Sequence, residues 1–257
     1  MQPLVLITGA SSGIGLSLAE VFAGKGWRLA LVARRSSEIR QHMSALGVAL
    51  EQFRVFQADV CDHAAMQAMG RECLSQMGVP DVVIANAGIS LGVDLSDPED
   101  LSVMARILDT NVMGVAATFA PFIEPMRARG HGKLVGISSV AGIRGLPGHG
   151  AYCASKAAVI SLCESLRAEL RGSGVRVQTI CPGYIATPLT QNNRYKMPFL
   201  MPSQDFAARA YEVVMSASSY RVIPWQMSVV AKLLRALPNG WFDAIFAKRA
   251  RKARLKH

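Results

Sequence analysis

Six short runs of mostly apolar and β-branched residues recur along the first 183 residues of the chain, and segments with helical spacing separate them. The apolar runs cover residues 4–10, 28–34, 54–60, 81–88, 132–139 and 175–183, and the helical segments cover 14–24, 36–46, 63–77, 99–126 and 151–171. Near-continuous apolarity is typical of strands that are buried on both faces. Strands that alternate with helices form a parallel sheet through right-handed crossovers. The pattern therefore predicts one α/β domain over residues 1–257, in which a doubly wound parallel sheet lies between two layers of helices.

The pattern changes after Pro182, where residues 188–204 are irregular and contain three prolines. A long irregular segment inside a compact domain is usually functional, so we expect this one to be a lid over the substrate. A helix is expected to follow at 205–217. The lid carries five large apolar side chains, which suit a flexible hydrophobic substrate or simply pack the lid itself. They are Leu189, Met197, Phe199, Leu200 and Met201.

The last part of the chain, residues 225–257, is expected to form one or two amphipathic helices broken at 237–240 and to end in a basic segment. Residues 232–257 contain eight Lys or Arg and one acid, Asp243, so this segment carries +7 of the net charge of +10. A basic amphipathic helix can lie on an anionic membrane surface. It can also pack over the pocket or on a neighbouring subunit, with its last basic residues solvated, and the sequence leaves these alternatives open.

Several classes of protein are disfavoured by what the sequence lacks. The sequence contains no stretch of about 18 consecutive apolar residues, so no transmembrane helix is predicted. The first residues also lack the pattern of a signal peptide. The five cysteines are scattered without paired spacing, so a cytoplasmic protein with reduced thiols is expected. We predict no metal site, because no cluster has ligand spacing. We also expect no nucleic-acid binding, because no recognisable module accompanies the positive charge.

The stretch TGASSGIG, residues 8–15, follows a predicted strand and opens a predicted helix. In that context the glycines let a ligand approach the backbone, and the amides at the helix N-terminus can meet a pyrophosphate. The spacing is G-x-x-x-G-x-G, which differs from the usual G-x-G-x-x-G of dinucleotide sites. The stretch predicts a dinucleotide site, although a tight strand-to-helix connection alone would also need glycines.

Arg34 and Arg35 follow the second predicted strand, roughly twenty residues after the glycine motif. A site for NAD usually has an acid at this point, which binds the ribose 2′-hydroxyl. Two guanidinium groups suit a 2′-phosphate instead, because arginine stays charged and matches the geometry of phosphate. The pair therefore favours NADP(H) over NAD(H), unless it is only a solvated charge pair at the end of a strand.

Tyr152 and Lys156 stand four residues apart, so they share one face of the helix predicted at 151–171. A phenol has a pKa near ~10, and a nearby ammonium group favours the phenolate and lowers that pKa. Such a pair can transfer protons, because catalysis is most efficient when the pKa approaches the working pH. This spacing alone is common in helices. Ser139, however, ends a predicted strand, and ligands of open α/β sheets bind at the carboxyl ends of strands.

Taken together, these motifs resemble the compact branch of the short-chain dehydrogenase/reductase family, from Leu4 to about Thr187. The matching stretches are TGASSGIG, ANAG at 85–88, Asn111 in DTNVMG, Ser139, the pair Tyr152 and Lys156, and Pro182–Gly183 followed by Thr187. Ala85 stands where the family has an asparagine. The resemblance implies a Rossmann-type fold with three layers and a C-terminal helical extension.

The resemblance also implies a mechanism, in which a hydride passes between nicotinamide and a carbonyl carbon. Tyr152 would be the general acid or base, and Ser139 would bind the substrate carbonyl. Lys156 would hold the nicotinamide ribose and lower the pKa of Tyr152. Asn111 would hold a water that links Lys156 to solvent, or would only stabilise a bulge in its helix.

The same resemblance implies the residues that bind the cofactor. Asp59 and Val60 would contact adenine, unless Asp59 only caps a helix, and Ile185 and Thr187 would contact the carboxamide. The full set of implied cofactor contacts is Gly9, Ser11, Ser12, Gly13, Ile14, Gly15, Arg34, Arg35, Asp59, Val60, Asn86, Gly88, Tyr152, Lys156, Ile185 and Thr187. Arg144 and His149 are further candidates for the pocket lining.

We therefore predict an NADP(H)-dependent oxidoreductase that interconverts a ketone or aldehyde and an alcohol on an apolar or lipid-like substrate. One alternative is an enzyme of the same fold that acts on a sugar or nucleotide-sugar. Another is a non-catalytic NADP(H)-binding scaffold, although such a protein would be expected to lack the tyrosine or the lysine. The resemblance further suggests a homodimer or homotetramer formed through the helices at 99–126 and 151–171.

Overall fold

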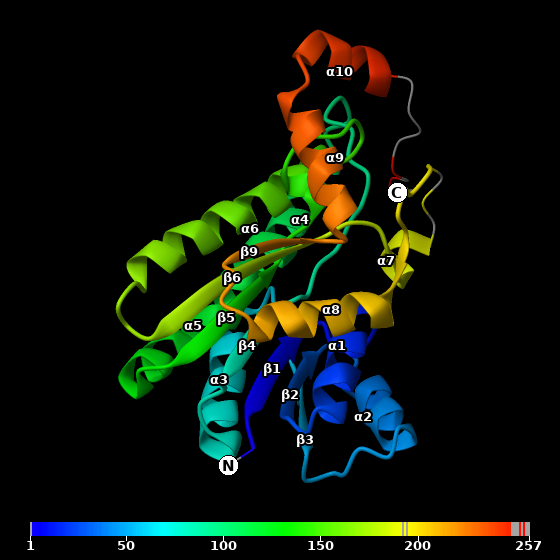
Figure 1. Ribbon diagram of the computed structural model, residues 1–257. Helices are drawn as coiled ribbons and strands as arrows, with labels where there is room; N and C mark the ends of the chain where they lie inside the picture. The colour runs from blue at the N-terminus through cyan, green and yellow to red at the C-terminus, as the bar shows by residue number, and fades with distance from the viewer. Residues whose placement is uncertain (1, 192, 194, 248–251, 253, 255–257) are drawn as a thin grey trace.

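The computed structural model describes residues 2–191, 193, 195–247, 252 and 254, and a seven-stranded sheet forms the centre of this part of the chain (Figure 1). Its strands are β1 (Leu4–Thr8), β2 (Arg28–Ala33), β3 (Phe53–Gln57), β4 (Val82–Ala85), β5 (Gly132–Ile137), β6 (Val175–Pro182) and β9 (Tyr220–Ile223). They lie in the order β3-β2-β1-β4-β5-β6-β9, and all neighbouring pairs are parallel. Successive strands are added on one side of β1 as far as β3 and then on its other side from β4 onward. Ligands of such sheets bind at this switch point between β1 and β4.

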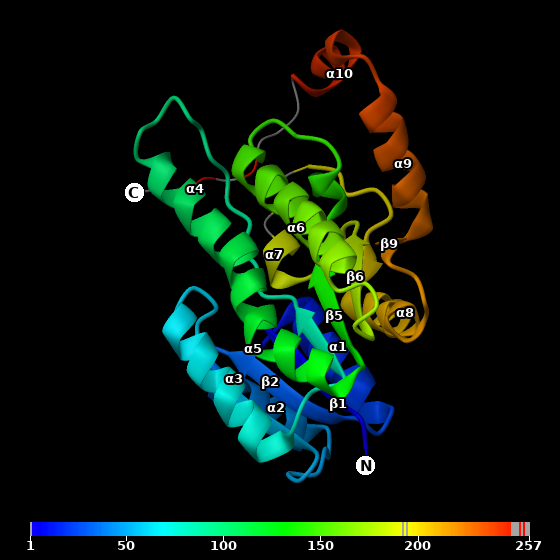
Figure 2. The same ribbon diagram turned by 90° about the vertical axis from the view of Figure 1, so that its left-hand side faces the viewer.

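Helices cover both faces of the sheet, which confirms the predicted three-layer Rossmann-type fold (Figures 1 and 2). One layer contains α1 (Gly13–Gly24), α2 (Ser36–Ala45) and α8 (Ser203–Met215), and the other contains α3 (His63–Met77), α5 (Gly114–Arg129) and α6 (Gly150–Glu169). Strand side chains alternate between the two layers. Val5 packs with Phe22 and Phe206 in the first core, while Leu6 packs with Phe122 in the second.

The six predicted strands are confirmed, each with fewer residues than expected and β3 beginning one residue earlier, but the sequence did not reveal β9. This strand has only four residues and pairs with β6 alone at the edge of the sheet. Its first two residues, Tyr220 and Arg221, are exposed, so it lacks the apolar run that marks a strand buried on both faces.

The helix expected at 99–126 is interrupted. It consists of α4 (Asp100–Leu108), a π-helical turn (Asp109–Met113) and then α5. π-turns inside α-helices are rare and frequently occur at functional sites. Here the turn contains Asn111, one of the predicted site residues.

The expected break in the tail is present, between α9 (Trp225–Ala236) and α10 (Asn239–Phe246). Both helices rise beyond the carboxyl edge of the sheet (Figure 1). The predicted basic end lies mostly outside the described residues, because 248–251, 253 and 255–257 are not among them. Across the part of the chain that the structure describes, no helix is long and apolar enough to span a membrane.

The predicted lid at 188–204 contains two short regular pieces. These are α7 (Pro188–Gln191) and β8 (Met201–Pro202), which pairs with β7 (Ile185–Ala186) in a small parallel sheet. Residues 192 and 194 of this segment lie outside the described residues.

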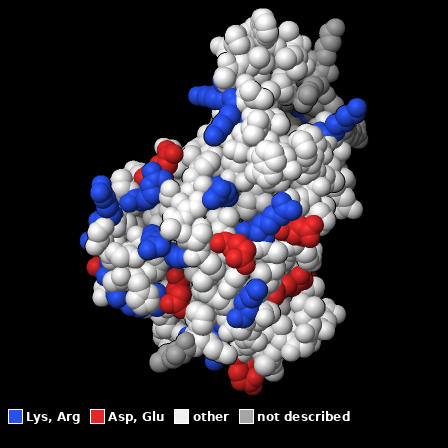
Figure 3. Space-filling model, viewed as in Figure 1, with Lys and Arg blue, Asp and Glu red and all other residues white. Residues whose placement is uncertain are grey.

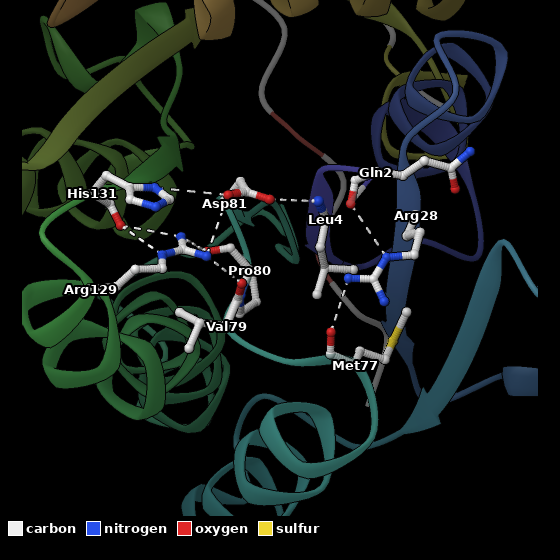
Figure 4. Close-up of polar contacts among 9 residues, drawn as sticks. All are labelled: Gln2, Leu4, Arg28, Met77, Val79, Pro80, Asp81, Arg129 and His131. Carbon is white, nitrogen blue, oxygen red and sulfur yellow. Dashed lines mark hydrogen bonds and ion pairs between the residues drawn. The ribbon is translucent and has the colours of Figure 1, made fainter.

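Polar side chains hold together the amino edge of the sheet, opposite the carboxyl edge (Figure 4). Asp81 accepts a hydrogen bond from the backbone of Leu4 at 2.8 Å and pairs with Arg129 at 3.4 Å. Arg129 also donates to the carbonyls of Val79 and Pro80, both at 2.7 Å. These contacts fix the start of β1 to the segments that lead into β4 and β5.

Candidate active site

A cavity of about 1110 Å³ runs along the carboxyl edge of the sheet, and its walls come from the segments that follow β1 to β6. Typical ligand pockets measure roughly 300–1,000 Å³, so this cavity has room for a dinucleotide together with a small substrate. All of the predicted site residues line it except Gly15 and Asn111. The structure therefore brings together the motifs that the sequence places at separate strand ends.

The glycine-rich turn at the end of β1 has a backbone that other residues would strain. Gly9 and Gly13 have φ angles of +67° and +56°, which L-residues other than glycine rarely adopt. Gly15 lies behind the cavity wall, where an added Cβ would stand 2.3 Å from the carbonyl oxygen of Gly9. No side chain caps the start of α1, so the amides of its first turn are available to an anion.

The side chains after β2 and β3 form one end of the cavity. Arg34 pairs with Asp59 at 3.5 Å, and its side chain remains 60 % exposed. Arg35 pairs with Glu38 at 2.8 Å and donates to the Ser11 hydroxyl at 3.4 Å. Arg35 thus lies beside the glycine-rich turn, Arg34 lies beside the segment after β3, and both arginines line the same cavity.

The alternative role of Asp59 as a helix cap is wrong. The residue that caps α3 is Asp62, whose carboxylate accepts from the backbone of Ala65 at 2.9 Å. Asp59 instead accepts from the backbone of Cys61 at 3.1 Å and lines the cavity. Its carboxylate is therefore placed both to pair with Arg34 and to meet a ligand.

Ser139, Tyr152 and Lys156 meet near the other end of the cavity. Ser139 follows β5 and accepts from the backbone of Ala141 at 3.1 Å, while Tyr152 stands in the first turn of α6 and shares a hydrogen bond with Ser139. Lys156 is only 4 % exposed, and its Nζ donates to the carbonyl of Ile137 at 2.9 Å. This Nζ lies 5.9 Å from the centre of the Tyr152 ring.

Burial is the largest influence on the pKa values of Tyr152 and Lys156. Burial raises the pKa of Tyr152 to about 12, although the hydrogen bond with Ser139 opposes this, and burial lowers the pKa of Lys156 to about 8. The expected lowering of the Tyr152 pKa by Lys156 is therefore wrong for the protein alone, because desolvation disfavours the phenolate more strongly. At neutral pH Tyr152 holds its proton and can act as an acid.

Asn111 lies behind the cavity wall and is fully buried. Its amide nitrogen donates to the Ile89 carbonyl and to the Ser155 hydroxyl, both at 2.9 Å, and its amide oxygen accepts from the backbone of Ile89 at 2.8 Å. These bonds connect Ile89, in the segment after β4, to Ser155 of α6, which directly precedes Lys156. Asn111 therefore supports the position of α6, and its role in holding a water stays a prediction.

The half of the cavity that contains Tyr152 includes His149, which the sequence analysis named as a candidate for the pocket lining, and polar partners to which it gave no role. The Tyr195 hydroxyl lies 3.0 Å from His149 Nε2, and His149 Nδ1 lies 3.2 Å from the Pro147 carbonyl. Because a carbonyl only accepts, Nδ1 carries the hydrogen and Nε2 accepts from Tyr195. Lys252 also lines this half, with its Nζ 2.6 Å from the Asn193 amide oxygen. Only the cavity wall, and no local motif, identifies these residues.

The apolar side chains of the lid were expected either to face a substrate or to pack the lid, and the cavity wall supports the first alternative at one position. Among the five apolar residues singled out there, Leu189 alone lines the cavity. Met201 is buried in the core of the first helical layer, whereas Phe199 and Leu200 are about half exposed, at 50 % and 46 %. Much of the apolar wall comes instead from the tail, through residues that include Met227, Val230, Leu234 and Phe246.

Arg144, which was expected to line the pocket, does so and also anchors this wall. Its guanidinium donates to the carbonyls of Leu234, Arg235 and Leu237 at the end of α9 and to the Asn239 side chain at the start of α10. It stacks over the Phe242 ring at 4.0 Å. One arginine from the loop after β5 therefore satisfies the free carbonyls of α9, which would otherwise need other partners.

We predict that Arg144→Ala loosens α9 and α10 without unfolding the sheet. Hydrogen bonds from charged groups contribute about 1.5–3 kcal/mol, so amide hydrogens of 225–246 should exchange at least about tenfold faster, while those of β1 and β4 stay protected. Arg144→Lys is the control, since it keeps the charge but loses the planar fork, and it should restore protection only in part. Unchanged exchange in Arg144→Ala would contradict the anchoring role.

Comparison with known proteins finds a family and relatives that cover most of the chain. Residues 3–198 match the family model described as short chain dehydrogenase. An uncharacterised oxidoreductase from Myxococcus xanthus is 39% identical over 242 residues, which cover 93% of this chain and 94% of that protein. The 2-(R)-hydroxypropyl-CoM dehydrogenase of Xanthobacter autotrophicus is 34% identical over 199 residues, or 74% of this chain and 78% of that protein.

Solved structures share the fold over most of the chain. A short-chain dehydrogenase/reductase from Burkholderia phymatum, in complex with NAD, has a TM-score of 0.82 and 24% identity and covers 100% of this chain and 98% of its own. An alcohol dehydrogenase from Thermococcus sibiricus, complexed with 5-hydroxy-NADP, has a TM-score of 0.76 and 24% identity, with coverage of 87% and 96%.

Proposed function

Because this chain belongs to the short-chain dehydrogenase family and is therefore an oxidoreductase, we propose that it interconverts a ketone or aldehyde and an alcohol with NADP(H). The observation that carries the proposal is the continuity of the cavity, which joins the two arginines after β2 to Ser139 and Tyr152. A dinucleotide that spans this cavity would bring its two ends to the two groups of residues that suit them.

The residues along the cavity fit the parts of NADP(H) in order. The amides of the first turn of α1 would hold the pyrophosphate, and Arg34 and Arg35 would hold the 2′-phosphate. Lys156 would hold the nicotinamide ribose, while the other predicted contacts would surround the adenine, the adenosine ribose and the carboxamide. When bound, the nicotinamide supplies or accepts the hydride at the carbonyl carbon.

The chain itself supplies the proton and orients the substrate. Ser139 would hydrogen-bond the substrate oxygen, which fixes the carbonyl beside the Tyr152 hydroxyl. In reduction, Tyr152 would give its proton to that oxygen as negative charge develops there, and in oxidation it would take the proton back. The buried ammonium of Lys156 would stabilise the negative charge in this site.

An apolar or lipid-like substrate is supported by the side chains of α9 and α10 in the cavity wall, which include Val230, Leu234 and Phe246. The name of the Xanthobacter relative, a hydroxypropyl dehydrogenase, supports the alcohol and carbonyl class of reaction. The alternative of a sugar or nucleotide-sugar would rest on the polar side chains of the same half, which include His149, Tyr195, Asn193 and Lys252.

The remaining expectations are part of the same proposal. We treat residues 1–257 as one domain, with 188–204 as its lid, and expect the protein to be cytoplasmic and a homodimer or homotetramer formed through α4, α5 and α6. Contact of the basic tail with a membrane surface is likewise proposed. The possibility of a non-catalytic scaffold is addressed by titration with cofactor.

We expect the protein to bind NADPH more tightly than NADH, and Arg34→Ala to weaken NADPH binding by about 10- to 100-fold with little change for NADH. This range corresponds to the loss of one or two charge-assisted hydrogen bonds to the 2′-phosphate. Cofactor fluorescence measures both affinities. Arg54→Ala is the matched control, since Arg54 is an exposed arginine on β3 that does not line the cavity.

A preference for NADH in the unaltered protein would overturn the 2′-phosphate assignment. Binding of neither cofactor would remove the main support for catalysis by this chain. Tight NADPH binding without turnover of any carbonyl in a broad screen would favour the scaffold.

A further inference from the structure

The outer faces of α9 and α10 expose a row of large apolar side chains. On α9, Trp225, Val229 and Leu233 stand four residues apart, so they share one face, and they are 67, 48 and 67 % exposed. On α10, Trp241 and Ile245 have the same spacing and are 70 and 52 % exposed. We call these five residues the outer face of α9 and α10.

The fold itself does not use this face, because other residues of the same helices do the packing. Met227 and Ala231 of α9 and Phe242 and Phe246 of α10 are buried, and they face the cavity or the rest of the protein. An apolar side chain in water is normal when it stands alone, but a contiguous apolar surface usually marks an interaction site.

The charges near the outer face are positive. Lys232 and Arg235 are exposed on α9, and Asp243 is the one acid of residues 225–247. On the side of the molecule drawn in Figure 3, the region of α9 and α10 forms a broad uncharged area bordered by Lys and Arg, and the acidic side chains lie farther down. An apolar surface with basic residues beside it fits a partner that is apolar inside and negative at its surface.

We propose that the outer face of α9 and α10 docks on an anionic lipid bilayer. Tryptophan rings favour the boundary between hydrocarbon and water, and each lysine or arginine near an anionic leaflet adds electrostatic attraction. The contact is peripheral, with the helices lying in the interface. It involves described residues of the two helices and does not depend on the basic end of the chain.

A second copy of this chain is a less suitable partner. A two-fold contact is made by the same patch on both subunits, so it would bring Lys232 and Arg235 of both copies to one interface. Asp243 would be the one acid from each copy to offset them. Anionic lipid headgroups supply the missing negative charge, whereas a second copy adds more positive charge.

Docking on a bilayer would also place the substrate half of the cavity next to the membrane, since residues on the inner side of α9 and α10 line that half. An apolar substrate could then pass from the bilayer to Tyr152 without crossing water. This consequence rests on the proposed carbonyl reaction, whereas docking itself does not.

The test uses the full chain with vesicles of phosphatidylcholine, with and without phosphatidylglycerol. Binding is measured by co-sedimentation and by tryptophan emission. Trp27 is buried at 6 % exposure, so a blue shift on binding reports Trp225 and Trp241. We expect binding to the vesicles that contain phosphatidylglycerol, with weaker binding as salt increases.

Leu233→Glu should reduce vesicle binding at least about tenfold, because it removes a large apolar contact and adds a repulsive charge. Leu50→Glu is the matched control. Leu50 is 71 % exposed in the loop before β3, at the amino edge of the sheet, so vesicle binding should not change. NADPH affinity of both variants should stay as in the unaltered protein, which shows that they are folded.

Failure of vesicle binding in the unaltered protein would overturn the proposal. So would equal loss of binding in both variants. If the protein ignores vesicles, and Leu233→Glu alone splits an oligomer seen by analytical ultracentrifugation, then a second copy covers this face. Vesicle binding without carbonyl reduction would contradict only the proposed function, and reduction of a water-soluble carbonyl without vesicle binding would contradict only the docking.

Discussion

Tyr152→Phe is expected to lower kcat for carbonyl reduction by about 10²–10⁴-fold, the range that general acid catalysis contributes, while the Kd for NADPH stays within about twofold. Phenylalanine keeps the ring but has no proton to give, and the hydrogen bond with Ser139 is lost. The measurement is NADPH oxidation with the best substrate from a carbonyl screen, together with fluorescence titration of the cofactor. Loss of rate without loss of binding separates chemistry from assembly of the site.

Tyr195→Phe is the matched control for this result. Tyr195 also lines the cavity, but its hydroxyl is bonded to His149 at 3.0 Å rather than to Ser139. Its replacement should alter KM more than kcat. If the two variants lost kcat equally, or if Tyr152→Phe kept its activity, Tyr152 would not be the proton donor.

The protonation of Tyr152 also predicts how rate depends on pH in each direction. Since burial raises the pKa of Tyr152 to about 12, the acid form is present at neutral pH, and reduction should weaken only as alkaline pH removes the proton. Oxidation needs the phenolate, so its rate should rise with pH over the same range. Profiles of kcat/KM for both directions test this, and parallel profiles would be inconsistent with one group that acts as acid and base.

The parallel sheet explains why so much of the site could be predicted from the sequence. In such a sheet all the carboxyl ends lie at one edge, so Gly9, Arg34, Asn86 and Ser139 had to meet once their strands were recognised. The buried strands were recognisable because they are apolar on both faces. The structure agrees, because these four residues line one cavity.

The parts that were missed depend on contacts between distant segments. His149 was a candidate for the pocket lining, but its partner Tyr195 was missed, because the two are 46 residues apart and meet only through the path of the lid, which has no periodic pattern. The π-turn that contains Asn111 leaves no mark in helical spacing, and a bulge at this point was expected only from the family resemblance. The pKa of Tyr152 depends on burial, which the spacing of tyrosine and lysine does not reveal, so the rise that desolvation causes was not expected.

Lys156→Met is expected to remove most of the activity, by about 10²-fold or more if the ammonium supports proton transfer as proposed, and yet to stabilise the fold at pH 7. Methionine has a similar length and no charge. The ammonium of Lys156 is 4 % exposed and has a carbonyl as its hydrogen-bond partner. Burial lowers its pKa from 10.5 to about 8, which corresponds to a cost of about 3 kcal/mol for the charged form. Loss of the hydrogen bond to Ile137 offsets about 1 kcal/mol of the gain.

The dependence on pH distinguishes this explanation from a simple change in packing. Below pH 8 both the folded and the unfolded protein carry the proton, so the cost of burying the charge is fully present. Between pH 8 and 10.5 the folded protein releases the proton first, and the stability of the unaltered protein gains relative to that of the variant. Urea unfolding at pH 7 and at pH 10 should therefore show an advantage for Lys156→Met that shrinks or reverses at pH 10. The same replacement at the exposed Lys232 should give a difference that does not change with pH. If Lys156→Met raised the free energy of unfolding equally at pH 7 and at pH 10, the buried charge of Lys156 would not be what destabilises the unaltered protein.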